Sequence, residues 1–298
     1  MEDKIKQYKP NIKPSTIKAY IQNLEKIKMI LNLPNDNIKT FLKALGDKSN
    51  IDALLNTLQY TTIRNYYNSI IVLLQAYGGD KDIIEAYIKH RDIYNNQYKE
   101  WASKNEMSGT QKKNWVEMDE VIDIMNSYNN KEGLQKYTLL RLFIEYPLRN
   151  SFKNLEITTM AKYNRLTKED KAERNFFIKQ QSPIRFSLAI NDYKTYGTYG
   201  EKVFNITDPA LTADLSKFLR VSKHTSYLFT DGNTPFTSTG LTKYFNSIFK
   251  PTGKSISTTL LRHIITSDKM GANHKEQMEL SDKMGHSVAQ NKDYIKYK

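Results

Sequence analysis

Apolar side chains in the first third of the chain recur at three- and four-residue intervals, as in Ile17, Tyr20, Ile21 and Leu24. That spacing places them on one face of an α-helix, and no stretch here alternates apolar and polar residues as a half-buried strand does. We expect five amphipathic helices, which begin near Ser15, Ile38, Ile51, Thr61 and Asp80. Residues 1–103 are therefore predicted to fold as a small all-helical domain.

The helical spacing stops at residues 104–114, which contain a Ser-Gly step and a Lys-Lys pair and are predicted to form an interdomain linker. Residues 115–298 mix two patterns. We expect helices through Ile122 and Met125, at 134–145, 208–219 and 239–249 and around Arg262, and strands at 175–178, 186–190 and 202–206. The Gly- and Thr-rich residues 191–200 predict a hairpin turn. The fold class is therefore mainly α with a small antiparallel β-sheet (α+β).

The charge balance favours a polyanionic partner, because 45 Lys and Arg residues oppose 32 Asp and Glu residues and leave a net charge of +13. A soluble basic protein without such a partner is the alternative. The chain has no cysteine, which excludes disulfides, thiolate metal sites and a cysteine nucleophile. It begins with charged residues and has no apolar stretch of about 18 residues, so we expect a soluble intracellular protein of unspecified compartment, without membrane contact.

The last forty residues carry the chemistry. Arg262 and His263 lie in a helix-like stretch, Gly285 and His286 follow, and Tyr294 comes eight residues after His286. These residues supply a permanent cation, an imidazole and a phenol. Such a set is suited to attack on a phosphodiester with the tyrosine as nucleophile.

Together with Met284 and Ser287, these residues resemble the C-terminal signature of the tyrosine recombinases, also called phage-type integrases. The resemblance implies that residues 1–103 are a core-binding domain that clasps DNA and that residues 115–298 are the catalytic domain. In the first domain, basic residues at exposed positions form either a solvated helix face or contacts to DNA phosphates: Lys18, Lys26, Lys28, Arg64, Lys89, His90 and Arg91.

The resemblance also implies a role for each site residue. Arg149, which follows a buried helix, and Arg262 would grip the phosphate oxygens, and Tyr294 would form a covalent 3′-phosphotyrosine. Lys194, at the start of the hairpin turn, would protonate the leaving 5′ oxygen, with Lys202 as the alternative. His286 would bond a phosphate oxygen or orient the phenol. No metal, ATP or other cofactor is implied.

Three positions depart from the family pattern. Thr259 stands where a histidine is usual, and Phe152 stands where many members have an acidic residue. His263 is not assumed to replace the missing histidine, because the next helix position points about 100° away, and we expect it to be a packing residue. The usual nucleophile spacing falls on Ile295, so Tyr294 is one residue short and Tyr297 two residues long; we favour Tyr294.

The predicted function is that of a site-specific recombinase or integrase of a mobile genetic element or virus, acting on double-stranded DNA as a homotetramer that joins two sites. A type IB topoisomerase that relaxes DNA is one alternative. A catalytically inactive DNA-binding relic is another, because Thr259 replaces a histidine. Delivery of Tyr294 in cis or to a neighbouring protomer, the target sequence, and the choice among integration, excision and resolution are left open.

Overall fold

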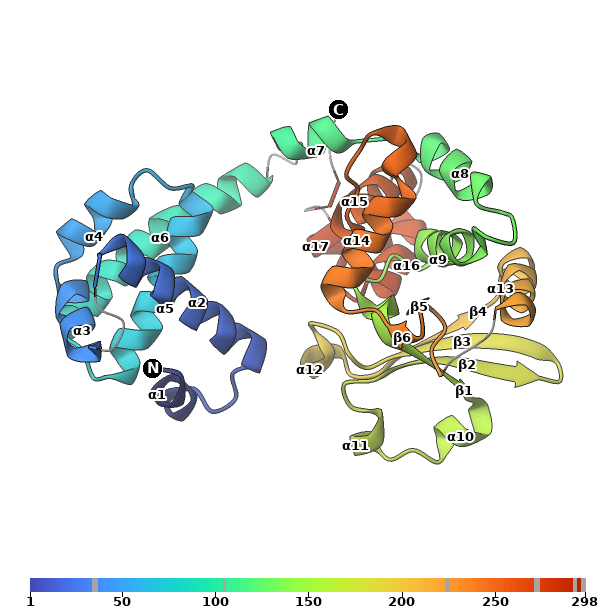
Figure 1. Cartoon of the computed structure of the whole chain (residues 1–298), viewed down its shortest axis with the longest axis horizontal. Helices are drawn as coiled ribbons and strands as arrows, with labels where there is room; N and C mark the ends of the chain where they lie inside the picture. Colours follow the sequence, from blue (N-terminus) through green and yellow to red (C-terminus); the bar gives the residue numbers. More distant parts are fainter. Residues whose placement is uncertain (34–36, 104–105, 223–225, 271–273, 292–293, 296–298) are drawn as a thin grey trace. The chain divides into compact units, whose positions relative to one another are not determined.

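The computed structural model describes residues 1–33, 37–103, 106–222, 226–270, 274–291 and 294–295. The chain divides into two compact units, Met1–Lys104 (unit 1) and Asn105–Lys298 (unit 2). Figure 1 shows the helices and strands of each unit. Within the described ranges, no helix combines the length and the apolar character that crossing a bilayer requires.

Unit 1 is built from helices in the part that the structure describes. They are α1 (Glu2–Tyr8), α2 (Pro14–Ile30), α3 (Ile38–Gly46), α4 (Lys48–Leu55), α5 (Tyr60–Ala76) and α6 (Lys81–Ser103). The five predicted helices are confirmed with small shifts at their ends. Helix α1 was not predicted, because Ile5 is its one buried residue and a single apolar position gives no periodicity.

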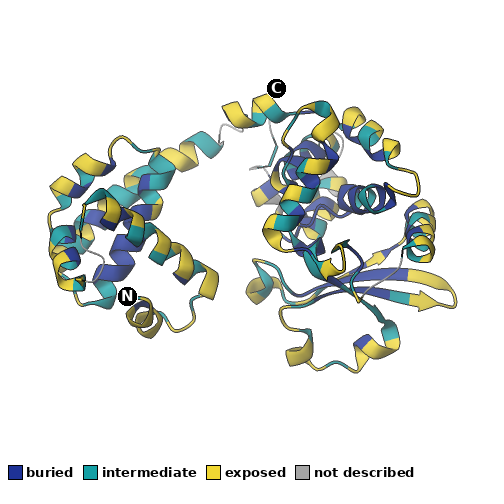
Figure 2. Ribbon diagram, viewed as in Figure 1, coloured by how far each residue is buried: buried dark blue, intermediate teal, exposed yellow. Residues whose placement is uncertain are grey.

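Helix α5 forms the centre of unit 1. Nine of its residues are buried, and it contacts α1, α2 and α6. Figure 2 shows its buried positions in dark blue. One predicted surface cation is buried: Lys28 is 4% exposed, and its ammonium lies 5.4 Å from the centre of the Phe41 ring. A long side chain can bury its methylene stem in this way, so the helical periodicity placed Lys28 on the wrong face.

Unit 2 contains the remaining helices. They are α7 (Gly109–Asn114), α8 (Met118–Ser127), α9 (Leu134–Glu145), α10 (Met160–Asn164), α11 (Lys168–Lys171), α12 (Tyr196–Tyr199), α13 (Pro209–Val221), α14 (Ser238–Ile248), α15 (Thr258–Lys269), α16 (His274–Met284) and α17 (Val288–Asn291), with 3₁₀ turns η1 (Ser151–Asn154) and η2 (Lys250–Thr252). The predicted bounds of α9 are confirmed. Its end follows from Pro147, which disfavours helix in the preceding residue.

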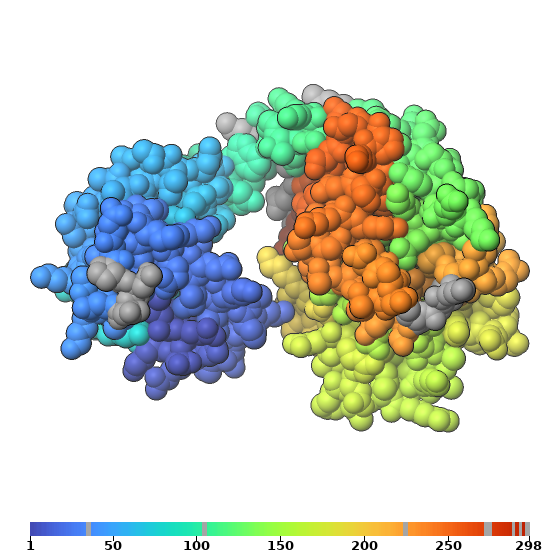
Figure 3. All heavy atoms as spheres, viewed as in Figure 1, coloured from blue at the N-terminus to red at the C-terminus, as the bar shows by residue number. Residues whose placement is uncertain are grey.

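Helix α7 lies within residues 104–114, the predicted linker, for which no helix was predicted. Ser108 caps it: Ser108 Oγ accepts from Gln111 N, and Ser108 N donates to Gln111 Oε1. The end of α7 lies beside the segment before α15, where Ser255 N donates to Asn114 Oδ1 at 2.8 Å. Figure 3 shows the surface of unit 2 at this junction. The apolar pattern missed α7 because none of its residues is buried.

The main sheet has four strands in the order β1 (Leu155–Thr159), β2 (Asn175–Gln181), β3 (Ile184–Ile190) and β4 (Lys202–Ile206). Strands β5 (Thr230–Asp231) and β6 (Thr234–Pro235) form a separate pair. The three predicted strands are confirmed, and β3 pairs antiparallel with β4 as in a hairpin, with Ile190 opposite Lys202. The connection is longer than a simple turn, because it contains α12. The sheet is mixed and not wholly antiparallel as predicted, because the unpredicted β1 pairs parallel to β2.

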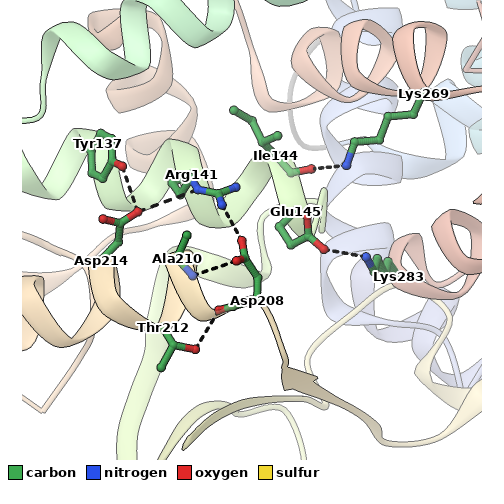
Figure 4. A network of polar contacts seen from close by, with 10 residues as sticks. All are labelled: Tyr137, Arg141, Ile144, Glu145, Asp208, Ala210, Thr212, Asp214, Lys269 and Lys283. Atoms are coloured by element: carbon green, nitrogen blue, oxygen red, sulfur yellow. Dashed lines mark hydrogen bonds and ion pairs between the residues drawn. The ribbon is translucent and has the colours of Figure 1, made fainter. Parts of the chain in front are cut away.

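The mainly helical fold with a small sheet is confirmed. The core of unit 2 lies between α9, α13, α14, α15 and the sheet, with eight buried residues on α9 alone. Polar contacts join α9 to α13, α15 and α16 (Figure 4). Arg141 binds Asp208 at the start of α13, and Lys283 Nζ on α16 donates to Glu145 Oε1 at 2.8 Å. The Lys283 contact anchors the end of α16 against α9.

Candidate active site

Arg262 is held by the apolar face of α15. Ser257 Oγ caps the helix by accepting from Leu260 N, and Leu261 and Ile265 on the same face are buried. Arg262 is only 1% exposed, and its Nε donates to Pro147 O, at the end of α9, at 2.8 Å. One edge of the guanidinium is therefore bound to the backbone, while the two Nη groups point toward the pocket described below.

Arg149 follows the buried end of α9 and is exposed. Its loop is tied to the beginning of α15, because Thr258 Oγ1 donates to Asn150 Oδ1 at 3.1 Å. Thr258 is itself buried. The arginine loop and the arginine helix are thus joined one residue from Arg149 and four residues from Arg262.

The two guanidinium groups meet on one oxygen. Arg149 Nη2 donates to the Tyr294 hydroxyl at 2.7 Å, and Arg262 Nη1 donates to the same oxygen at 3.1 Å. The Arg262 guanidinium also lies 4.6 Å from the centre of the Tyr294 ring, a cation–π contact. The structure therefore brings Arg149, Arg262 and Tyr294 of the same chain into one pocket.

His286 enters the pocket from the turn after α16. Gly285 has φ +71°, in the left-handed region, and His286 N donates to Ser281 O while Gly285 N donates to Asp282 O. This is the Schellman ending of a helix, and a residue with a side chain would be strained at Gly285. The turn stacks the His286 ring on the Tyr294 ring, with centroids 5.0 Å apart, and sets His286 Nε2 at 2.7 Å from Arg262 Nη2.

Burial controls the charges in the pocket. It lowers the pKa of His286 to about 4, with further lowering from the Arg262 charge, so the imidazole is neutral at pH 7. Burial also lowers the pKa of Arg262 to about 10, so its guanidinium stays charged at that pH. Within the described residues, no carboxylate pairs with Arg149 or Arg262. The pocket therefore carries uncompensated positive charge, which suits an anionic ligand.

The segment between β3 and β4 lies against the Gly285 turn. Thr195 Oγ1 donates to Gly285 O at 3.2 Å, and the Tyr193 ring would be 3.5 Å from a β-carbon at Gly285. Lys194 stands between these two residues and is exposed. Lys202 Nζ donates to Asp282 O and Oδ1, each at 3.0 Å, and its charge contributes to the lowered pKa of His286. Both lysine candidates therefore come from the hairpin that borders the pocket, and Lys202 is the one whose ammonium is bound there.

Of the remaining candidates, His263 contacts the tyrosine segment. Thr259 is exposed on α15. His263 Nδ1 contacts the backbone oxygen of Tyr294 at 2.8 Å, and the two rings are 5.0 Å apart, so His263 packs on the tyrosine segment. Tyr297 lies outside the described residues. Phe152, at the position of the usual acidic residue, is fully buried in the core.

Sequence reasoning missed the residues that hold the pocket together. Thr258 and Asn150 join the two arginine-bearing segments, and Asn291 bonds His286. Asn291 is fully buried, although asparagine is usually an exposed residue. No sequence pattern marks these positions: Thr258 and Asn150 are 108 residues apart, and the role of Asn291 depends on the direction of its side-chain amide.

Comparison with known proteins gives structural matches alone. No family model matches the chain, and no curated protein matches it by sequence. The structure is similar to that of XerA recombinase, with a TM-score of 0.43 and 13% identity over 100% of this chain and 93% of that chain. It is also similar to the Tn1549 transposon integrase in complex with transposon right-end DNA, with a TM-score of 0.45 and 12% identity over 94% of this chain and 95% of the other. For the same integrase in complex with a circular-intermediate DNA, the TM-score is 0.46 and the identity is 13%, over 93% of this chain and 95% of the other.

Proposed function

We propose that this protein is a site-specific tyrosine recombinase that cleaves and rejoins double-stranded DNA through a covalent 3′-phosphotyrosine. The observation that carries the proposal is the convergence of Arg149 Nη2 and Arg262 Nη1 on the Tyr294 hydroxyl, at 2.7 and 3.1 Å. The phenol oxygen supplies the nucleophile, and the two permanent cations supply the positive charge that stabilises attack on a phosphodiester.

The reaction follows from these contacts. The guanidinium groups of Arg149 and Arg262 would donate hydrogen bonds to the non-bridging oxygens of the scissile phosphate. Negative charge grows on these oxygens as the tyrosine attacks. The Tyr294 oxygen forms a bond to phosphorus, and the bond from phosphorus to the 5′ oxygen breaks. One phosphoester replaces another, so rejoining by the 5′ hydroxyl needs no ATP. The phenol must lose a proton and the leaving oxygen must gain one.

His286 acts on this pocket as a neutral ring. Its stacking on the Tyr294 ring limits the rotation of the phenol, and its Nε2 accepts from Arg262 Nη2. Arg262 is thereby bound on two sides, by Pro147 O and by His286, which leaves Nη1 directed at the reacting oxygen. Restricting the donors before the substrate arrives is how such a site lowers the barrier.

A lysine is proposed as the general acid that protonates the leaving 5′ oxygen. We favour Lys194, since Lys202 Nζ is already bound to Asp282. A substrate with sulfur in place of the leaving 5′ oxygen distinguishes the two, because a thiolate leaves without a proton. With the ordinary substrate, Lys194→Ala should slow cleavage about 10²- to 10⁴-fold, and the sulfur substrate should restore the rate. Rescue of Lys202→Ala and not of Lys194→Ala would assign the role to Lys202.

The test of the proposal is a covalent adduct with DNA. The target sequence is unknown, so the protein is incubated with a library of nicked duplexes in which the released strand diffuses away and the adduct is trapped. Detergent-resistant protein–DNA complexes are then isolated and sequenced. Wild-type protein should form an adduct on a defined set of sequences, Tyr294→Phe should form none, and Tyr297→Phe should retain it.

The alternatives give different results in the same system. A topoisomerase relaxes supercoiled plasmid as a monomer and does not exchange strands between two sites. A recombinase joins two copies of the recovered sequence, and we propose that it does so as a homotetramer with unit 1 contacting DNA. The mass of the complex on two sites, measured by light scattering, tests the tetramer. An absence of adduct on every sequence, from protein whose fold is intact, would favour an inactive DNA-binding protein.

A further inference from the structure

The hydrogen bonds around His286 determine which of its ring nitrogens carries the proton. The ring is neutral, so one nitrogen donates and the other accepts. A guanidinium can only donate, and Arg262 Nη2 lies 2.7 Å from His286 Nε2. Nε2 must therefore be the acceptor, and the proton is on Nδ1. The partner of Nδ1 is Asn291 Oδ1, at 3.3 Å.

Asn291 is itself fixed in the orientation that accepts this proton. Its side chain is fully buried at the end of α17. Its Nδ2 donates to Ser281 Oγ and, at 3.5 Å, to Gln277 O, both on α16. If the amide were flipped, Asn291 Oδ1 would face Gln277 O, and two acceptors would meet. Asn291 Nδ2 would then face the protonated His286 Nδ1, and two donors would meet. The contacts with α16 therefore decide the direction of Oδ1.

The same residue also holds the nucleophile. Asn291 O accepts from Tyr294 N at 2.9 Å. The side chain of Asn291 thus contacts the His286 ring, while its backbone oxygen binds Tyr294, on which that ring stacks. A single buried asparagine connects the helix α16, the imidazole and the tyrosine segment.

We propose that Asn291 is a positioning residue that keeps the proton of His286 on Nδ1, so that Nε2 accepts from Arg262 and holds its guanidinium in place; this inference builds on the proposed function. In the other tautomer, the Nε2–H would face an Arg262 N–H, donor against donor, and the guanidinium would be displaced. The cost would appear in the reaction, because the other Nη of Arg262 is the one directed at the Tyr294 oxygen.

Burial and the neighbouring cations keep His286 neutral, although its hydrogen bond with Asn291 by itself raises the pKa of the ring. The charged groups that face it are Arg262 on α15, Arg149 after α9, Lys202 on β4 and, bound to that lysine, Asp282 on α16. Tyr294 stacks on its ring. Three cations and burial keep the imidazole neutral, whereas Asn291 Oδ1 accepts its Nδ1 proton.

The first experiment measures the tautomer in the free protein, without DNA. The chain has five histidines, so ¹⁵N-labelled histidine spectra can be assigned with His286→Gln. Wild-type His286 should show a protonated Nδ1 and an unprotonated Nε2 at pH 7. Asn291→Leu, close in size but without an acceptor, should shift His286 toward the Nε2–H form. Asn291→Asp should keep Nδ1–H and raise the pKa of His286, because a carboxylate favours the imidazolium.

The second experiment measures the rate of adduct formation on the nicked substrate. Asn291→Leu should slow it about tenfold or more, as loss of a partner that orients an active-site imidazole does. Asn291→Asp should be close to wild type above the raised pKa of His286 and should slow as pH falls through it. Ser281→Ala, which removes one acceptor of the Asn291 amide, should fall between wild type and Asn291→Leu.

The outcomes separate this inference from the proposed function. An unchanged His286 spectrum in both Asn291→Leu and Asn291→Asp overturns the inference, whatever the activity. A shifted tautomer with an unaltered adduct rate also overturns it, because the position of Arg262 would then not depend on Asn291. If the spectra change as expected but wild-type protein forms no adduct, the proposed function fails while Asn291 still sets the tautomer. If Asn291→Leu does not fold, Asn291→Asp alone decides through its pH profile and spectrum.

Discussion

Each unit contains a polar cluster with a tyrosine and a cation, but the two clusters differ in how charge is balanced. In unit 1, the acid-paired cluster joins Lys48, Asp52 and Tyr67: Lys48 forms an ion pair with Asp52, and the Tyr67 hydroxyl donates to Asp52 Oδ1 at 2.6 Å. In unit 2, the active-site cluster joins Arg149, Arg262, His286 and Tyr294, and no carboxylate among the described residues pairs with its arginines.

The difference shows in what each tyrosine oxygen does. Tyr67 donates to a carboxylate, and burial together with that hydrogen bond raises its pKa, so its proton stays in place. Tyr294 accepts from two guanidinium groups. A cluster that balances its own charge can stabilise a fold, whereas one that leaves two cations unbalanced is prepared for an anion from outside. The carboxylate of Asp52, which has no equivalent beside Arg149 and Arg262 among the described residues, makes this difference.

The strongest test of this comparison removes each hydroxyl in turn. Tyr294→Phe should abolish the covalent adduct and leave the free energy of unfolding nearly unchanged. Tyr67→Phe should retain the adduct and lower the free energy of unfolding by about 1–3 kcal/mol, since it removes a buried hydrogen bond to a charged group. Trapping on the nicked substrate and urea unfolding measure the two effects. Equal behaviour of the two variants in both assays would show that the clusters do not differ in kind.

The next effect concerns the guanidinium group of Arg262. Arg262→Lys keeps a charge but cannot donate at once to Pro147 O, His286 and the reacting oxygen, so adduct formation should slow about 10²- to 10³-fold. Single-turnover trapping gives the rate. Its counterpart in unit 1 is Lys48→Arg, where a single ion pair to Asp52 is retained and the rate should be that of wild type. A small decrease in rate for Arg262→Lys would mean that a positive charge is sufficient and that the directions of the guanidinium N–H donors are not needed.

A third prediction concerns pH and stability. The pKa of His286 is about 4 in the folded chain, below its ordinary value of about 6.5 in the unfolded chain. Between these values the unfolded chain binds more protons, so the free energy of unfolding should rise as pH increases from 4 to 6.5 and then level, by at most about 3 kcal/mol from this residue. Urea unfolding of wild type and His286→Gln at several pH values isolates the contribution. Parallel curves for the two proteins would contradict the buried neutral imidazole.

The smallest effect is stabilisation by an added anion. Inorganic phosphate at about ten times its dissociation constant should raise the free energy of unfolding by about 1.4 kcal/mol if it binds the active-site cluster. Arg149→Ala should remove this response, whereas Asp52→Asn in the acid-paired cluster should keep it. Thermal melting across a phosphate series measures both. Loss of the response in Asp52→Asn and not in Arg149→Ala would indicate that phosphate binds unit 1 and would contradict the prediction.

The sequence specified most of the helices of the fold because their apolar spacing is a local property. Helix α9 was predicted to the residue, since eight buried side chains and Pro147 mark it. Strand β1, Leu155–Thr159, was missed: it has one buried residue, Leu155, and its partner β2 lies some twenty residues further along the chain. Parallel pairing of this kind is decided by tertiary contacts that no local pattern contains.

The candidate site was predictable where chemistry restricts the residue type and not where geometry does. Arg149, Arg262, His286 and Tyr294 could be named because their order and spacing resemble the tyrosine-recombinase signature, and the structure brings these four together. Asn291 could not be named, since its importance depends on the direction of one amide oxygen inside unit 2. The choice between Lys194 and Lys202 depends likewise on where an ammonium group lies.

The Tyr294 hydroxyl occupies the two guanidinium N–H groups that, in the proposed reaction, would hold phosphate oxygens. On that proposal, incoming DNA would first have to compete with the phenol for Arg149 and Arg262, and the displaced phenol could attack only afterwards. Binding and reaction would then be separated by a rearrangement whose rate does not depend on DNA concentration. Without DNA, the phenol would act as a competitive inhibitor within its own chain.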